Sequence, residues 1–147
     1  MTPRSRRRFL GKEEEARVVA AIKGAEAGNR GEVRVHIERT CAVAALERAR
    51  ALFAELRMVG TAEATGVLLY VAVDDRKAAV FAGSGIHGAE EPAFWQRVID
   101  AVADGFRRGK AVDGLVDALG AIGDLLRRVV PGPDTAGNEL PDEVTYR

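Results

Sequence analysis

The 147-residue sequence contains one cysteine, two histidines and no apolar run of the length that a membrane span needs. The lone thiol of Cys41 cannot form an intramolecular disulfide, so nothing in the chain requires an oxidising compartment. Together with one cysteine, His36 and His87 are too few to predict a transition-metal site. A transmembrane helix takes about 20 consecutive apolar residues. We therefore expect a cytoplasmic protein with neither a signal peptide nor a membrane span.

An excess of either charge is also lacking, because 22 lysines and arginines balance 22 aspartates and glutamates. A chain without net charge has no long-range attraction to nucleic acid or to an anionic membrane, so we expect no nucleic-acid partner. The local distribution is less even, since four arginines lie close to the N-terminus. They belong to residues 1–11, which we interpret as a basic N-terminal tail: Arg4, Arg6, Arg7 and Arg8.

The hydrophobic pattern predicts a single α/β domain over residues 12–130. Apolar residues at helical spacing predict four helices, at about residues 12–27, 42–57, 92–106 and 111–130. Three shorter patterns predict strands, at residues 32–38, 66–73 and 78–82. Residues 131–147 are rich in turn-forming residues and are interpreted as an extended C-terminal tail. This tail either packs on its own domain or mediates assembly with a partner.

The order and character of these elements predict the sheet. Residues 66–73 are continuously apolar, as in a central strand that is covered on both faces. Residues 32–38 alternate between apolar and polar side chains, which predicts a strand near the sheet edge with one face in water. The link at 74–77 is too short for a parallel crossover, so residues 67–82 should form an antiparallel hairpin. A crossover makes the first two strands parallel. We therefore predict a three-layer α/β sandwich, with helices flanking a small mixed sheet of three to four strands.

A glycine-rich run follows the hairpin, and its sequence Gly83-Ser84-Gly85-Ile86-His87-Gly88 has the spacing of a dinucleotide-binding loop. Such a loop belongs inside a βαβ unit, but the helix predicted after it is followed by another helix and by no strand. This order argues against dinucleotide binding. Consecutive backbone N–H groups before a helix can still attract a small anion. Ser84 lacks the two flanking glycines of a nucleophile elbow, so the run identifies no catalytic residue.

Acidic side chains form a second candidate site. Asp74 and Asp75 follow the central strand, and Asp113 lies near the start of the last helix. Carboxylate oxygens suit a hard divalent cation such as calcium, although Asp74 and Asp75 are also common turn residues of a hairpin. The aspartate turn and the glycine run lie at opposite ends of the hairpin, about 20 Å apart for six strand residues. One site therefore cannot use both.

Three stretches of the chain resemble the TPM domain family, including its small bacterial stand-alone members: "FAELRMVGTAEATGVLLYVAVDDRKAAVFAGSGIHG", "FWQRVIDAVADGFRRGKAVDGLVDALGAIGDLL" and "PGPDTAGNELPDEV". The resemblance extends from about Phe9 to Val144 and keeps the order and spacing of the motifs. It implies a sandwich of helices around a small sheet. It also implies links to acid-phosphatase-like activity, to divalent cations such as calcium, and to the maintenance of membrane complexes.

Two departures from that resemblance lie at the open end of the hairpin. Members usually carry Arg-Asn before the central strand and Gly-Asp in the glycine run, where this chain has Ala64-Thr65 and Ala82-Gly83. A cation and a carboxylate are thus both missing from one place, and their joint loss avoids an unpaired buried charge. The aspartate would have been a ligand for metal-assisted phosphoryl chemistry.

We therefore predict a binding module for a small anion or a protein partner, with a reduced phosphatase-like site. The alternative is a weak divalent-cation-dependent acid phosphatase that uses Asp74, Asp75 or Asp113. The candidate binding residues gather at the open end of the hairpin: Thr61, Thr65, Gly83, Ser84, Gly85 and His87.

Overall fold

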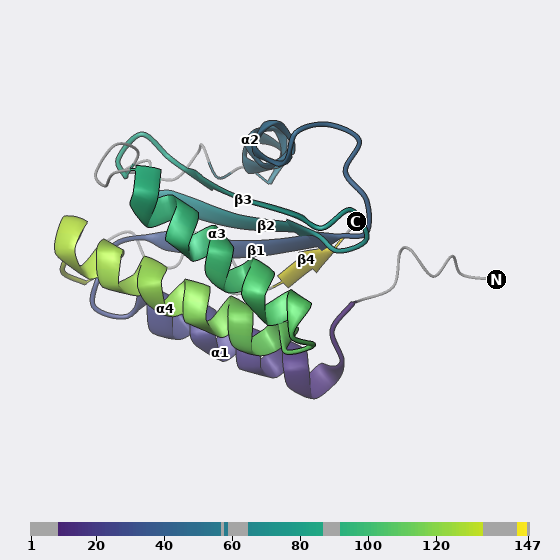
Figure 1. Ribbon diagram of the computed structural model, residues 1–147. Coiled ribbons are helices and arrows are strands. Elements are labelled where there is room, and N and C mark those ends of the chain that lie inside the picture. The colour runs from purple at the N-terminus through teal and green to yellow at the C-terminus, as the bar shows by residue number, and fades with distance from the viewer. Residues whose placement is uncertain (1–8, 57, 59–64, 87–91, 134–143, 147) are drawn as a thin grey trace.

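The architecture was analysed in a computed structural model, which describes residues 9–56, 58, 65–86, 92–133 and 144–146. In chain order, the elements are α1 (Lys12–Glu26), β1 (Glu32–Glu38), α2 (Ala45–Glu55), β2 (Gly66–Ala72), β3 (Lys77–Ala82), α3 (Pro92–Arg107), α4 (Ala111–Val129) and β4 (Val144–Tyr146) (Figure 1). Within the described residues, no helix has both the length and the apolar character needed to cross a bilayer.

The strands form one mixed sheet in the order β3-β2-β1-β4. β1 runs parallel to β2, whereas β2 and β3 are antiparallel, with Val67 opposite Ala82 and Ala72 opposite Lys77. This register confirms the predicted hairpin and its two separate ends. β4, which the sequence pattern did not identify, pairs in parallel with β1 through only three residues.

The prediction that residues 32–38 have one face in water is wrong, although β1 does lie near a sheet edge, next to the short edge strand β4. β1 lies between β2 and β4, and all seven of its residues are buried. Its polar side chains include His36, which is 1% exposed, and Glu38, which is 7% exposed. Alternation along the strand correctly separated an apolar from a polar face. It could not reveal that other elements supply hydrogen-bonding partners and cover the polar face.

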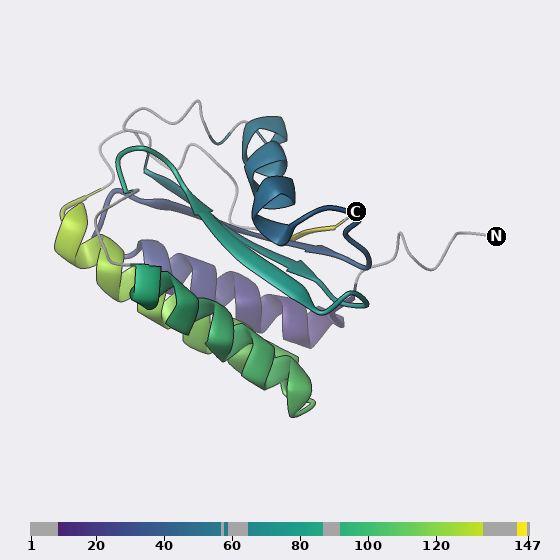
Figure 2. The ribbon, with the colours of Figure 1, turned by 45° about the horizontal axis from the view of Figure 1, so that its top comes forward.

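Helices cover both faces of the sheet, which confirms the predicted three-layer sandwich. α1, α3 and α4 lie side by side on one face, and α2 lies on the other (Figures 1 and 2). The apolar side chains of β1, such as Val33 and Val35, belong to the larger core beneath the three helices. A smaller core joins Leu68 and Tyr70 of β2 to Phe53 of α2.

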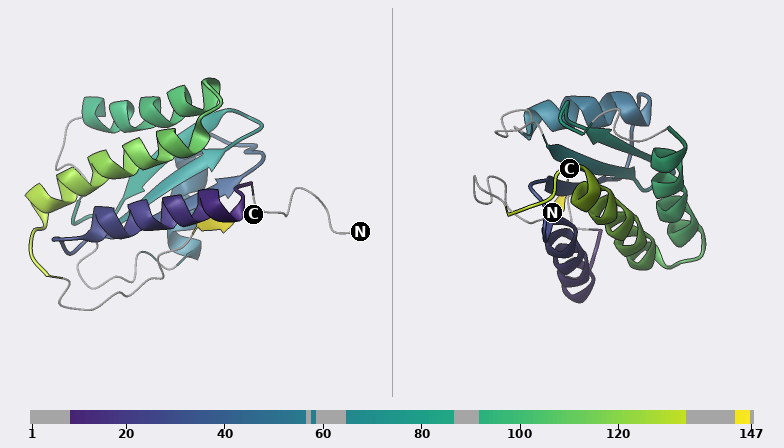
Figure 3. Two further views of the ribbon diagram at one scale, coloured as in Figure 1. Left: turned by 90° about the horizontal axis from the view of Figure 1, so that it is seen from below. Right: turned by 90° about the vertical axis from the view of Figure 1, so that its left-hand side faces the viewer.

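Close helix contacts hold the three-helix layer together, with α4 in the middle (Figure 3). A Cβ atom added at Gly105 of α3 would lie 2.6 Å from the Cα of Gly114 in α4. On the other side of α4, a Cβ at Gly123 would lie 2.8 Å from the Cα of Ala25 in α1. Both crossings therefore depend on residues without a side chain.

Residues near both ends of the chain contact the domain. Phe9 stacks on Phe106 of α3 with 5.9 Å between the ring centroids, and Leu10 is buried. At the other end, Val144 is buried, and the hydroxyl of Tyr146 donates a hydrogen bond of 2.8 Å to Glu15 of α1. The C-terminal residues 144–146 thus pack on their own domain.

Candidate functional site

The open end of the β2–β3 hairpin contains several residues predicted from the sequence. The N–H of Gly83 donates to the carbonyl of Gly66 at 2.8 Å, and this bond extends the hairpin by one step. Ser84 and Gly85 then form an exposed turn, which is closed by a 2.9 Å bond from the N–H of Ile86 to the carbonyl of Gly83. Thr61 and His87, the other two of the predicted loop residues, lie outside the described part of the chain.

Thr65 differs from the exposed turn residues because it is only 3% exposed. Its hydroxyl donates a 2.9 Å hydrogen bond to the carbonyl of Arg30, and its carbonyl accepts one from the N–H of Glu32 at 3.2 Å. Thr65 therefore fastens the start of β2 to the segment before β1. This position makes it a support for the open end, whereas Ser84 and Gly85 face solvent.

Backbone donors remain available in the exposed turn. Among the hydrogen bonds of the described residues, none uses the N–H of Ser84 or of Gly85. The strand that precedes them is paired with β2, and Gly83 adds one more bond to that pairing, so these two donors follow directly on the end of the hairpin. Adjacent backbone N–H groups of this kind can bind an anion or the carboxylate of a partner.

The predicted cation ligands are already engaged in hydrogen bonds. Asp74 accepts two from Arg39, at 3.0 and 3.3 Å. Asp75 accepts one of 2.7 Å from the N–H of Cys41, which ties the loop after β1 to the hairpin turn. The turn itself contains Arg76 at a φ of 54°, in the left-handed region. These contacts are those of residues that shape the turn.

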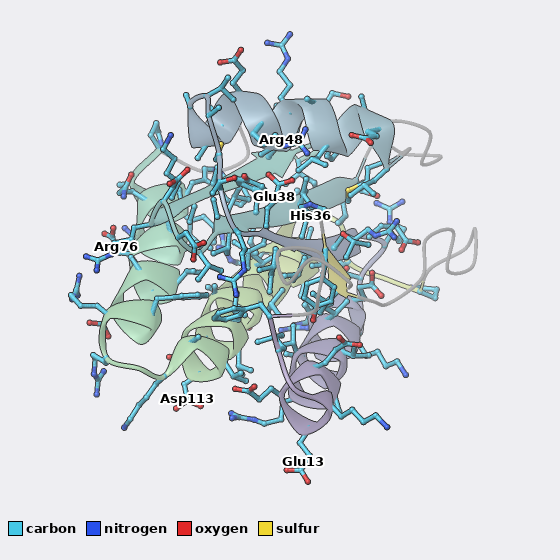
Figure 4. The ribbon with its side chains drawn as sticks, turned by 90° about the vertical axis from the view of Figure 1, so that its right-hand side faces the viewer. Glu13, His36, Glu38, Arg48, Arg76 and Asp113 are labelled. Atoms are coloured by element: carbon cyan, nitrogen blue, oxygen red, sulfur yellow. The ribbon has the colours of Figure 1, made fainter. Side chains whose placement is uncertain are left out.

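Asp113 lies in a different layer from the other two aspartates. It belongs to the first turn of α4 and accepts a 2.9 Å bond from Arg17 of α1, whereas Asp74 and Asp75 lie beside Arg76 at the hairpin turn (Figure 4). Within the described residues, no three histidine, cysteine, aspartate or glutamate side chains are grouped to hold a metal ion. Among the described residues, the three candidate ligands Asp74, Asp75 and Asp113 are therefore not brought together at one place.

A buried polar cluster that the sequence analysis did not identify lies near the hairpin turn. We call it the Glu38 cluster, and it comprises residues of four elements: His36, Glu38, Arg48, Tyr70 and Thr145 (Figure 4). Glu38 accepts two bonds from Arg48, at 2.7 and 3.0 Å, and a third from the hydroxyl of Tyr70 at 2.6 Å. The Nε2 atom of His36 lies 3.3 Å from Glu38, and its Nδ1 lies 2.7 Å from the hydroxyl of Thr145.

Electrostatics keep the carboxyl group of this cluster ionised. Burial alone raises the pKa of Glu38, but the hydrogen bonds from Arg48 and Tyr70 and the charge of Arg48 lower it from an ordinary 4.5 to about 2. Burial, with the neighbouring Cys41 and Glu38, raises the pKa of Tyr70, and the bond to Glu38 raises that of Arg48. An ionised carboxylate only accepts, so the Nε2 atom of His36 is the donor in its contact with Glu38.

The Glu38 cluster is suited to holding elements together. Arg48, Tyr70 and His36 all contact the carboxylate of Glu38, and its lowered pKa keeps it ionised at neutral pH, which is the state that accepts these bonds. One signal for it was present in the sequence, namely the polar alternation in residues 32–38. The partners Arg48, Tyr70 and Thr145 could not be assigned, because nothing local links positions so far apart in the chain.

A sequence model of the TPM domain matches residues 5–125 of the chain. Among solved structures, the chain is similar to the BA42 protein of the psychrophilic bacterium Bizionia argentinensis, with 34% identity and a TM-score of 0.85. That similarity covers 95% of this chain and 97% of the BA42 chain. No curated protein matches the chain in sequence.

Two more distant solved structures show the same fold. The N-terminal domain of a protein from P. gingivalis has 18% identity and a TM-score of 0.69, and the match covers 83% of this chain and 79% of the other. The N-terminal domain of the cg2496 protein from Corynebacterium glutamicum has 11% identity and a TM-score of 0.60, with 90% and 80% covered.

Proposed function

The chain belongs to the TPM domain family, and on this premise we propose that it is a binding module for anionic groups with a reduced phosphatase-like site. The ligand is either a small anion or the acidic group of a protein partner. It binds at the exposed turn after β3, where the backbone N–H groups of Ser84 and Gly85 donate to it. This turn is the only part of the predicted site at which described residues combine exposure with backbone donors that the fold does not use.

The engagement of the three aspartates is the observation that favours binding over hydrolysis. Arg39 holds Asp74, the N–H of Cys41 holds Asp75, and Asp113 pairs with an arginine of another helix. A metal-assisted phosphatase needs carboxylates that converge on one ion. These three carboxylates instead stabilise two separate places in the fold. Gly83 contributes no carboxylate at the position where the family resemblance implies one.

A phosphate titration followed by NMR tests the proposed site. Inorganic phosphate should shift the amide resonances of Ser84 and Gly85, while those of Asp74 and Asp75 at the other end of the hairpin stay in place. Ser84→Ala keeps the backbone N–H, so it should weaken binding by less than about threefold, whereas Ser84→Pro removes that donor and should abolish the shifts. Shifts confined to the aspartate turn, or none at millimolar phosphate, contradict the proposal.

The rival function, a weak divalent-cation-dependent phosphatase, is favoured by one feature of the topology. Asp74 and Asp75 follow the carboxyl end of β2, next to that of the parallel β1, and ligands of open α/β sheets commonly bind at such ends. Hydrolysis of p-nitrophenyl phosphate that EDTA stops would support this function. Asp74→Asn and Asp75→Asn keep oxygen acceptors for Arg39 and for the N–H of Cys41, so any lost activity would reflect the missing charge.

A further inference from the structure

The outward side of α2 is an exposed face that nothing in the described structure covers. α2 is the one helix on its side of the sheet among the described elements, and it packs on β2 and β3 (Figures 1 and 2). At its start lie two of the three large apolar side chains that are exposed in the described residues, with Val43 42% and Leu46 56% exposed. The third, Phe9, already stacks on Phe106.

Exposed residues continue along the same side of α2. We call this side of the helix, together with Val43 in the loop just before it, the α2 outer face, and its six members are all exposed: Val43, Leu46, Glu47, Arg50, Ala51 and Ala54. Helical positions three and four residues apart share one face. The inward positions Ala49, Leu52 and Phe53 are buried against the sheet. The outer face therefore combines two large apolar side chains, two small ones and one charge of each sign.

The helical residues of this face are complementary to themselves in an antiparallel arrangement. Consider a twofold axis that runs between the two copies of α2, level with the midpoint between positions 48 and 49. This axis places Leu46 level with Ala51 of the partner copy, and Glu47 level with Arg50. In an isologous interface every such contact occurs twice. Within the helix this gives two complementary pairs, Leu46 with Ala51 and Glu47 with Arg50, while Ala54 and the loop residue Val43 lie at opposite ends of the face.

We propose that the α2 outer face is a dimer interface, and that its partner is the α2 outer face of a second copy of this chain. Each Leu46 lies level with Ala51 of the partner copy, whose small side chain allows the two helices to approach closely. Each Glu47 meets Arg50 of the partner copy at the centre. Within the ion pairs of the described residues, Glu47 and Arg50 take part in none, so the dimer does not have to break an existing pair.

The size of this face sets the expected strength of the dimer. α2 has 11 residues, which span roughly 16 Å at 1.5 Å per residue. One helix pair of this length buries less than the roughly 1,600 Å² of a standard interface. The dimer should therefore form reversibly and depend on protein concentration. This inference does not rest on the anion site, which lies at the far end of the hairpin from the start of α2.

Sedimentation velocity over a range of concentrations, with charge reversals at the centre of the face, tests the dimer. Glu47→Arg and Arg50→Glu each place like charges opposite one another twice, and each should raise the dimer Kd about tenfold or more. The double variant E47R/R50E restores opposite charges and should return the Kd to within about threefold of the original. An equimolar mixture of the two single variants should form a heterodimer more readily than either variant dimerises alone.

Two further variants separate this interface from folding and from net charge. Asp117→Arg, at an exposed position of α4, changes the net charge as Glu47→Arg does and should leave the Kd unchanged. Leu46→Ser should weaken the dimer and leave the monomer's thermal unfolding nearly unchanged, because Leu46 is exposed. A chain that stays monomeric at the highest concentration overturns the inference. So does a dimer whose Kd ignores the reversals at Glu47 and Arg50.

Discussion

Glu38 lies on β1 and accepts hydrogen bonds from Arg48 of α2 and Tyr70 of β2. One carboxylate thus connects the sheet to the helix on one of its faces. Its neighbour His36 extends the connection to β4 through the hydroxyl of Thr145. Because Glu38 is 7% exposed, its charge is tolerated only while these donors surround it.

We expect Glu38→Gln to lower the free energy of unfolding by about 3 kcal/mol at pH 7, because it leaves the partly buried charge of Arg48 unpaired. The contribution also depends on pH. A folded pKa of about 2, below the ordinary 4.5, means that the stabilisation is complete above pH 4.5 and is lost as the pH falls towards 2. Urea unfolding of both proteins at pH 7 and pH 3 measures the difference, which should shrink at pH 3.

Asp117→Asn provides the control for this prediction, because it removes an exposed carboxylate of α4 that forms no ion pair among the described residues. Its unfolding free energy should stay within about 0.5 kcal/mol of the original protein at both pH values. A constant difference between Glu38→Gln and the original protein from pH 7 to pH 3 would contradict the pKa assigned to Glu38.

Individual site residues were predicted with uneven success. The sequence led to Gly83, Ser84 and Gly85 because backbone-rich turns have a local signature, and the structure describes an exposed turn there. Whether that turn binds an anion stays a prediction. The partners of Asp74 and Asp75 were not predictable, since Arg39 and Cys41 come from the loop after a different strand.

The crossing of α3 and α4 depends on a pair of glycines. A Cβ at Gly114 would lie 2.8 Å from the carbonyl oxygen of Ala101 and 3.0 Å from the Cα of Gly105. Backbone atoms cannot rotate away as a side chain can, so the two helices would have to separate. We expect Gly114→Ala to lower the unfolding free energy by about 2–4 kcal/mol, as measured by urea denaturation.

Gly120 gives a matched comparison on the same helix. Nothing lies within 4 Å of a Cβ at this position, which is exposed on α4. Gly120→Ala should therefore raise the unfolding free energy by about 0.5–1 kcal/mol through the helix propensity of alanine. If both alanine variants change stability in the same direction, the close approach of α3 and α4 does not limit the size of the residue at position 114.

The elements themselves were largely predictable, because their periodicities are local. The four helices and the hairpin occur where apolar spacing and link length place them. α2 begins at Ala45, three residues later than predicted. Lys77 explains the delay, since its ammonium donates at 2.9 Å to the carbonyls of Cys41 and of Val43, and so holds the preceding segment in a loop.

For the molecule as a whole, β4 brings the C-terminal segment back to one edge of the sheet. It covers the second edge of β1, and its three residues are attached by strand pairing, by the Thr145–His36 bond and by the bond from Tyr146 to Glu15. Deleting residues 144–147 should therefore lower the unfolding free energy by about 1–3 kcal/mol. The amide hydrogens of Val35 and Ile37 should also exchange faster.

Sedimentation of the deleted protein distinguishes docking within one chain from assembly through the tail. Its oligomeric state should match that of the full chain, because β4 binds its own domain. If the truncated protein kept its stability but formed smaller oligomers, the C-terminal tail would instead mediate assembly between chains.

Point variants at Thr145 test the hydroxyl alone. Thr145→Val removes the hydroxyl and should lower the unfolding free energy by less than the deletion does, whereas Thr145→Ser keeps the hydroxyl and should unfold nearly as the original protein does.

Local spacing was enough to predict helices, strands, the hairpin and the α/β class, because each follows from side-chain periodicity and link length over fewer than 20 residues. Local spacing could not predict that His36 and Glu38 are buried, or that β1 lies between two other strands of the sheet. Those features required Arg48, Tyr70 and Thr145 to meet across four elements, the last of them about 110 positions along the chain from His36. A polar side chain can be buried only where such donors surround it, and long-range packing alone brings them there.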